Sequence, residues 1–374
     1  MRTNESATVE QPHAGRAALC GALGLAVLGV GQAAQPPLTE GGSALHNRSL
    51  GYVLTERRWA VYETEGGKTE CPQGFNEGNR EEFKKLFPTD GRERTVAETQ
   101  LKREGEQWHP ETVDYSMPFK EAQGRISYGL NLDGKTDAQD FASPEGEPGI
   151  DNQLYRAIGC TAGYRTGGPF YHFENLFMQQ SGDSRVLLEI GDIDDLTQDE
   201  QVTVTTYRGL DSLLTDASGL DFMPGGTQRI DTRWGRQYVS RTTGKIVDGV
   251  LITEPIDKLL MPWGRGISFQ YQVFRGTRFK LKLTPDKAEG LLAGYADVDS
   301  YTLRKSEGWS THHQSYGQFS MISQYQAMKR LADGYPDPKT GKNTAISSAM
   351  RVKFTQVFIQ HPDKELMTQQ RPAH

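Results

Sequence analysis

Three groups of residues in this 374-residue chain have side chains that could carry chemistry, and the first is a run of oxygen ligands. Its members are Asn131, Asp133, Asp137 and Asp140. With Gly134 at the sharp turn, their spacing approaches that of a calcium-binding loop, in which roughly six to eight oxygens surround the ion. However, Gly129 stands at the first ligand position, and an Asp replaces the usual final Glu. The pattern therefore predicts either a calcium site or a plain polar turn at the end of a strand.

The second group consists of acids, and it suggests glycoside hydrolysis. Glu189, Asp192 and Asp194 follow an apolar run. The group resembles the strand motif of retaining sandwich glycosidases, which need two carboxyls about 5 Å apart. In a regular strand, however, Glu189 faces away from Asp192 and Asp194. Only a bulge at Gly191 would bring the three together. The alternative is an acidic turn at the end of the strand.

The third group is aromatic and suggests ligand binding. Trp234, Trp263 and Trp309 are candidates for a platform on which a sugar ring stacks. The alternative is that these tryptophans pack in the core or at the edges of a sheet, where large aromatic side chains also settle.

Other sequence features exclude several common functions. The motifs HExxH, GxSxG and GxGxxG are absent, which removes the commonest hydrolase and dinucleotide-binding hypotheses. With 42 Lys and Arg against 48 Asp and Glu, the net charge is −6. A chain with this balance lacks the positive charge that nucleic acid requires, so no nucleic-acid partner is predicted.

The N-terminus predicts export. Residues 17–31 form an uncharged apolar run of 15 residues after Arg16. About 20 residues are needed to span a bilayer, so the run fits a secretory signal peptide over 1–33. The alternative, an apolar helix of the folded domain, is disfavoured by the four glycines in the run. We therefore expect a periplasmic or secreted protein with no transmembrane segment in the mature chain.

Two cysteines remain after such cleavage, Cys71 and Cys160. In an oxidising compartment they are expected to form one disulfide, although two buried free thiols are the alternative.

The elements that must position these groups are mostly strands. Apolar residues alternate with polar ones in several successive stretches, for example over 267–273 and 279–283. Strands that follow one another without intervening helices favour antiparallel sheets. The sequence therefore predicts a mainly β, antiparallel β-sandwich (jelly-roll-like) with a few short helices. One longer amphipathic helix is expected near 318–333, where apolar residues recur at a spacing of three before Gly334.

The predicted organisation has five parts. They are a signal peptide (1–33), a flexible lead (34–50), a loop-rich, disulfide-closed N-terminal part (51–170), a strand-dense β-sandwich part (171–362) and a polar tail (363–374). Such folds host many activities, so function rests on the three groups above. The leading hypothesis is an exported, non-catalytic protein that binds a glycan or another cell-envelope component, with calcium as the one candidate cofactor. The alternatives are a carbohydrate-active enzyme and a structural component of the envelope.

Overall fold

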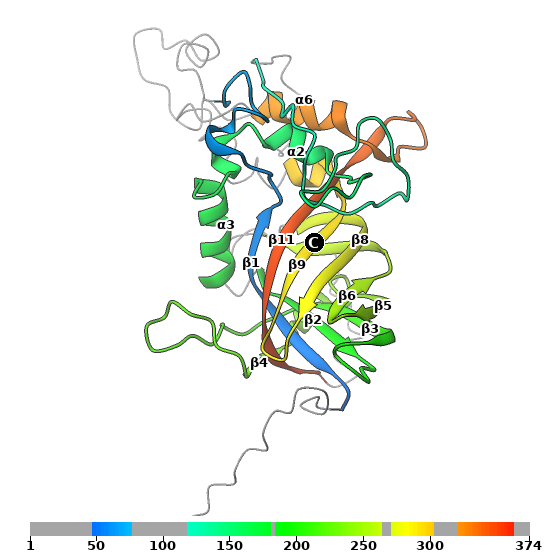
Figure 1. Ribbon diagram of the computed structural model, residues 1–374. Helices are drawn as coiled ribbons and strands as arrows, with labels where there is room; N and C mark the ends of the chain where they lie inside the picture. Colours follow the sequence, from blue (N-terminus) through cyan, green and yellow to red (C-terminus); the bar gives the residue numbers. More distant parts are fainter. Residues whose placement is uncertain (1–46, 77–117, 181–183, 264–270, 303–320, 363–374) are drawn as a thin grey trace, which may run out of the picture. The chain divides into compact units, whose positions relative to one another are not determined.

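The computed structural model describes residues 47–76, 118–180, 184–263, 271–302 and 321–362, all within the compact unit Thr39–His374. These residues form one large sheet with a few helices (Figure 1). The structure is 43% strand and 16% helix. The predicted mainly β, antiparallel fold is therefore confirmed, whereas residues 1–46, and with them the predicted signal peptide, lie outside the described part.

Eight strands of the sheet form a closed ring. Their order is β1-β2-β3-β5-β6-β8-β9-β11, and β11 pairs again with β1. The remaining strands extend the sheet: β4 pairs with β11 in parallel, β7 pairs with β8, and β10 pairs with β11. The strands belong to one sheet and not to two separate ones, an arrangement compatible with the predicted sandwich. The bounds are β1 Leu50–Trp59, β2 Val186–Gly191, β3 Asp199–Arg208, β4 Gly226–Arg229, β5 Ser240–Val247, β6 Val250–Thr253, β7 Ile256–Pro262, β8 Tyr271–Leu283, β9 Lys287–Asp297, β10 Gly334–Pro336 and β11 Asn343–Gln360.

Alternation along the strands separates an inner core from a smaller outer one. On β1, Tyr52 and Leu54 belong to the main cluster of buried side chains, while Val53 packs in a second cluster with Leu187 and Val357. This is the period-2 pattern expected of a strand with two covered faces. A cavity among Leu54 and other buried side chains measures about 10 Å³, room for roughly one water molecule and not for a ligand.

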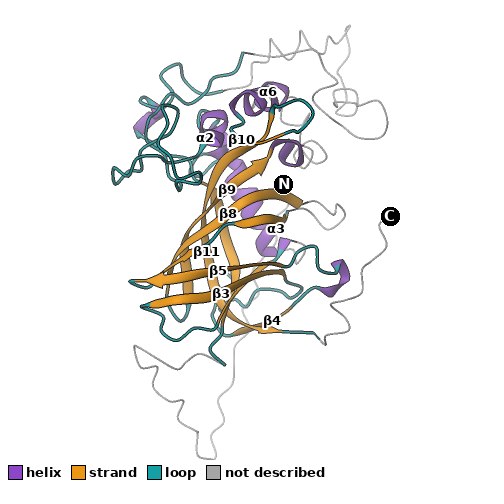
Figure 2. Cartoon of the chain, turned by 90° about the vertical axis from the view of Figure 1, so that its right-hand side faces the viewer, coloured by secondary structure: helices purple, strands orange, loops and turns teal. Residues whose placement is uncertain are grey.

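The main helices are α2 (Gln153–Ile158), α3 (Pro169–Gln180) and α6 (Met321–Leu331), and residues 298–302 are helical as well. Helix α6 confirms the helix predicted near 318–333, and the apolar positions Ile322, Tyr325 and Met328 are buried as their spacing predicted. Figure 2 shows α2 and α6 together beyond one end of the sheet. Among the described helices, none has the length and apolar character needed to cross a bilayer.

Helix α3 takes the place of a strand along part of β1. Strand β1 pairs with β2 only from Leu50 to Val53, which leaves the rest of that edge without a neighbouring strand. The side chain of Asn175 fills this position: its Oδ1 accepts from the Arg57 amide (2.8 Å) and its Nδ2 donates to the Arg57 carbonyl (2.7 Å). One turn later, Gln179 donates to the Thr55 carbonyl (2.9 Å). Residues four apart share a helix face, so α3 lies along β1 as Figure 1 shows.

A buried arginine holds the C-terminal end of α3. The guanidinium of Arg185 donates to the carbonyls of Met178 (3.0 Å) and Gln179 (3.5 Å), and also to that of Asp211 (3.1 Å). The last carbonyls of a helix have no partner within the helix, and these donors satisfy them. A positive charge at this end is also favourable, because the C-terminal end of the helix dipole is negative. Burial lowers the pKa of Arg185 to about 10, so the side chain remains charged at neutral pH.

The side chain of Arg57 connects β1 with the end of β7. Arg57 is 1% exposed, donates to the Pro262 carbonyl (3.3 Å) and lies with its guanidinium carbon 3.5 Å from the ring centroid of Trp263. Trp59 stacks on Trp263 with ring centroids 5.8 Å apart. These contacts join the two strands through side chains where no backbone ladder does so.

Candidate functional site

A pocket of about 140 Å³ lies at the end of the sheet where β1 and β11 finish their pairing. Four separate segments supply its walls: the end of β1 and the residues after it, the loop that carries Tyr128, the short turn following α2, and the middle of β11. The lining residues are Arg58, Trp59, Val61, Glu63, Tyr128, Tyr164, Arg165, Thr166 and Arg351. Polar and aromatic side chains therefore dominate the lining, as in sites that orient a small polar ligand.

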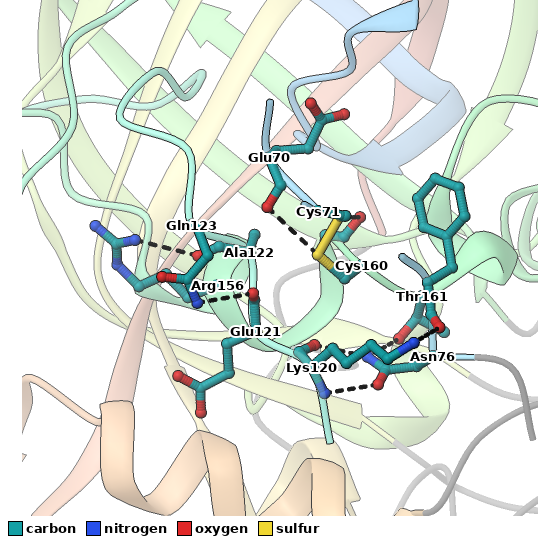
Figure 3. Close-up of a disulfide and its surroundings, with 12 residues drawn as sticks. Glu70, Cys71, Asn76, Lys120, Glu121, Ala122, Gln123, Arg156, Cys160 and Thr161 are labelled. Carbon is teal, nitrogen blue, oxygen red and sulfur yellow. Dashed lines mark hydrogen bonds between the residues drawn. A yellow bond between two sulfur atoms is a disulfide. The ribbon is translucent and has the colours of Figure 1, made fainter. Parts of the chain in front are cut away.

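A disulfide fixes two of the segments near this pocket. Cys71 and Cys160 are bonded, with Cα atoms 5.6 Å apart and a sequence separation of 89 (Figure 3). The disulfide predicted from the sequence is therefore present. Cys160 directly follows the C-cap of α2, and Arg165 lies five positions further along the chain. The bond thus ties the segment that carries Arg165 to the segment that carries Glu70.

A buried ion pair between Glu70 and Arg165 also joins these two segments. The fully buried carboxylate of Glu70 accepts from Arg165 (2.6 Å), from the Thr64 amide (2.9 Å) and from the Thr64 hydroxyl (2.5 Å). Burial acts to raise the pKa of Glu70, but these hydrogen bonds outweigh it, and the pKa lies below its ordinary value. Glu70 is therefore ionised at neutral pH. Since Arg165 also donates to the Gly159 carbonyl (3.1 Å), its guanidinium is held in a fixed position.

The other two arginines of the pocket come from the sheet. Arg58 on β1 lies directly opposite Arg351 on β11 in the antiparallel register. The guanidinium carbon of Arg351 lies 4.9 Å from the ring centroid of Tyr128. Glu63 accepts from the amide (2.8 Å) and the hydroxyl (3.0 Å) of Thr166. The pocket therefore offers guanidinium donors beside an aromatic ring, a combination suited to binding.

The oxygen ligands predicted for calcium lie in two successive turns of one loop, at 131–135 and 137–140, and three of them accept backbone hydrogen bonds there. Asn131 Oδ1 accepts from the Gly134 amide (2.7 Å), and Asp133 Oδ1 accepts from the Lys135 amide (2.8 Å). Asp140 accepts from the amide of Asp137. Within the described residues, no group of three or more His, Cys, Asp or Glu side chains is placed to hold a metal ion. Calcium binding by this loop stays a prediction.

Glu189, the first of the predicted acids, lies on the outer face of β2. Its Oε2 accepts from the Tyr207 hydroxyl (2.8 Å), and its Oε1 lies 2.8 Å from His361 Nε2 and 3.3 Å from the Ser49 hydroxyl. Burial, and after it the charge of Glu189, raises the pKa of Tyr207.

The other two acids engage different partners. Strand β2 ends at Gly191, and Asp192 adopts a positive φ of 62°, so the chain turns there. Asp192 Oδ2 accepts from the Thr203 hydroxyl (2.7 Å), while Asp194 forms an ion pair with Arg48 (2.5 Å). The catalytic role proposed for the three acids stays a hypothesis.

The three tryptophans differ in their surroundings. Trp263 is 4% exposed and is a core residue, stacked on Trp59. Trp234 is half-buried; its indole nitrogen donates to Asp231 (3.0 Å), and the Arg208 guanidinium carbon lies 4.7 Å from its ring centroid. Trp309 lies outside the described residues.

The chain matches no protein-family model, no curated protein and no solved structure. Sequence reasoning also missed the arginines of the pocket, because Arg58, Arg165 and Arg351 belong to no local motif. One signal was present: two adjacent arginines, Arg57 and Arg58, interrupt an otherwise strand-like run. Charged side chains within a buried strand are rare unless they are paired or serve a function.

Proposed function

We propose that this protein is an exported, non-catalytic binding protein, and that it holds a glycan or another cell-envelope component in the pocket between β1, β11 and the turn after α2. The observation that carries the proposal is the pocket itself: about 140 Å³ of space lined by three arginines and two tyrosines from separate segments. Side chains with fixed donors and an aromatic wall are the usual means of orienting a sugar.

The covalent framework supports both the site and export. The Cys71–Cys160 disulfide closes a long loop beside the pocket and restricts the position of Arg165. Disulfides persist in oxidising compartments and are rare in reducing ones. A disulfide that anchors the site therefore fits a protein that works outside the cytoplasm, as the apolar run at 17–31 also predicts.

A glycan array probed with the mature protein tests this function. We expect binding to a restricted set of saccharides, and we expect it to be lost in Thr166→Trp, which places a large ring in the pocket lining. Gln201→Trp is the matched control, because Gln201 is an exposed strand residue that does not line the pocket. Binding that survives Thr166→Trp would show that the site is elsewhere. An array without any bound saccharide would contradict glycan binding.

A further inference from the structure

One line of side chains crosses the outer face of the sheet, with one member on each of five neighbouring strands. Each member is the register partner of the next, and from β5 to β11 they are Lys245, Ile252, Lys280, Leu291 and Arg351. The adjacent residues on the opposite face belong to the main core: Ile246, Leu251, Leu281, Leu292 and Val352. Since successive side chains of a strand point to opposite faces, the five members point outward. We call them the cationic row.

The three cations of this row face solvent. Lys245, Lys280 and Arg351 are exposed, and Ile252 between the two lysines is 36% exposed. Within the described part of the chain, no carboxylate lies within 4.0 Å of the charged nitrogens of these three cations. The guanidinium carbon of Arg351 lies 4.9 Å from the ring centroid of Tyr128 instead. The row therefore presents three positive charges that form no ion pair within the described residues.

The neighbouring rung, two residues further along β8, β9 and β11, has a different pattern. There Glu289 is the register partner of both Lys282 and Lys353, and Lys353 forms an ion pair of 2.8 Å with Glu56. Lys282 donates to the Asp248 carbonyl (2.6 Å). Positive and negative charges alternate on this rung, and both lysines are engaged within the protein. In the cationic row, positive charges alternate with apolar side chains, so its charges remain for a partner.

The spacing of the cations indicates the shape of that partner. They stand on every second strand, and neighbouring strands are about 4.8 Å apart, so the cations are roughly 10 Å apart over a row of roughly 20 Å. Repulsion between exposed charges at this separation is largely screened at physiological salt, where the Debye length is about 8 Å. A ligand that contacts all three cations must be extended and must carry several negative charges.

Taking the class of ligand from the proposed function, we propose that the cationic row binds an acidic polysaccharide chain that leaves the pocket and crosses the strands. Arg351 belongs both to the row and to the pocket lining, so a chain held in the pocket continues directly onto the row. Carboxylate or sulfate groups of the chain form charged hydrogen bonds with the three cations, and the C–H faces of its sugar rings pack on Ile252 and Leu291.

Calorimetric titration of the full mature chain tests this inference through the length and charge of the ligand. The probes are octagalacturonate, digalacturonate, a sulfated galactose octamer and a neutral galactose octamer. We expect an acidic octamer to bind at least tenfold more tightly than digalacturonate, because one chain then engages several cations at once. The neutral octamer should lack this gain. Added salt should weaken the acidic octamers more than the neutral one.

A double variant tests the residues of the row. Lys245→Gln with Lys280→Gln should weaken binding of the acidic octamer by about 4- to 20-fold, since each exposed ion pair contributes a factor of up to about five. Binding of digalacturonate and the melting temperature should not change. Lys258→Gln with Lys339→Gln is the matched control, because it removes two exposed lysines outside the row. The control should bind the acidic octamer as the wild type does.

The possible outcomes separate this inference from the proposed function. If the row variant binds the acidic octamer as tightly as the wild type, or if the control loses as much affinity, the row is not the site. The proposed function then stands as long as saccharide binding is lost in Thr166→Trp. Polyglutamate of equal charge, or anionic lipid vesicles, bound as tightly as octagalacturonate would show that the row recognises charge and not a polysaccharide. Absence of binding by every saccharide would reject the proposed function and this inference together.

Discussion

Replacing Asp151 by asparagine should stabilise this protein at neutral pH. Asp151 is 6% exposed and precedes α2; its Oδ2 accepts from the amide of Leu132 (2.6 Å). Burial raises the pKa of Asp151 to about 6, and the negative charges of Asp133 and Asp140 act in the same direction. The hydrogen bond from Leu132 opposes this rise without cancelling it.

The size and pH range of the effect follow from this pKa. The ordinary value of 3.8 applies to the unfolded chain, whereas the folded value is about 6, so the folded state holds the proton more tightly. Below about pH 4 both states are protonated and Asp151 makes no difference. Between about pH 4 and pH 6 only the unfolded state ionises, and the stability falls. Above pH 6 the full penalty of about 3 kcal/mol applies.

Urea unfolding of the wild type and of Asp151→Asn, measured from about pH 4.5 to pH 8, checks this expectation. Asparagine keeps an oxygen for the Leu132 amide and carries no charge. We expect Asp151→Asn to be more stable by about 3 kcal/mol at pH 7.5 and by only about 1 kcal/mol at pH 4.5. Asp257→Asn, at an exposed position, should leave the free energy of unfolding within about 0.5 kcal/mol at every pH.

Two results would refute the reasoning. The first is a stability difference between wild type and Asp151→Asn that does not change with pH, because the effect must follow titration of this carboxyl. The second is an Asp151→Asn variant that is less stable at pH 7.5. That result would mean that the ionised carboxylate contributes more through its hydrogen bonds than burial costs it.

The remaining predictions concern the disulfide, the α3–β1 contact, one glycine and the calcium hypothesis. Removing the disulfide by Cys71→Ser with Cys160→Ser should lower the free energy of unfolding by about 4–5 kcal/mol, given a sequence separation of 89 between the cysteines; a loss under 1 kcal/mol in urea titrations would contradict this. Asn175→Ala should cost about 2–4 kcal/mol, since it removes both hydrogen bonds from α3 to the buried backbone of Arg57, and unchanged stability would show that α3 does not replace a strand. Gly51→Ala should destabilise by about 1–3 kcal/mol, because the added Cβ would lie 2.6 Å from the Val357 carbonyl; a melting temperature equal to the wild type would disprove the contact. If the loop at 131–140 binds calcium, the melting temperature must be higher with calcium than with chelator, and equal values would remove the metal from consideration.

The contact between α3 and β1 is a feature that the sequence alone did not predict. Residues Tyr52–Thr55 are rich in the aromatic and β-branched types that favour strands, and the structure places that segment in β1. That strand loses its β2 neighbour after Val53, however, and Asn175 takes over the pairing from a helix. Local periodicity cannot reveal such a replacement, because a helix residue far along the chain makes the bonds.

In the candidate site, too, the sequence predicted what depends on neighbouring residues, and the tertiary structure decided which distant residues meet. The sequence placed the oxygen ligands in one short loop, and the structure has Asn131 and Asp133 in one turn of that loop and Asp140 in the next, because they are close in the chain. Arg58 and Arg351 became a candidate site only through the pairing of β1 with β11. Two residues so far apart in sequence carry no shared spacing from which their meeting could be inferred.

The sequence by itself determined the properties that depend on neighbouring residues: strand alternation, the period of α6 and the net charge. It also predicted the disulfide that the structure contains, because Cys71 and Cys160 are the two cysteines outside the predicted signal peptide. Tertiary structure alone decided that the sheet closes by pairing β1 with β11, and that three arginines surround one pocket. The physical reason is that periodicity reports which face of an element is buried, whereas the choice of partner depends on the packing of the whole chain.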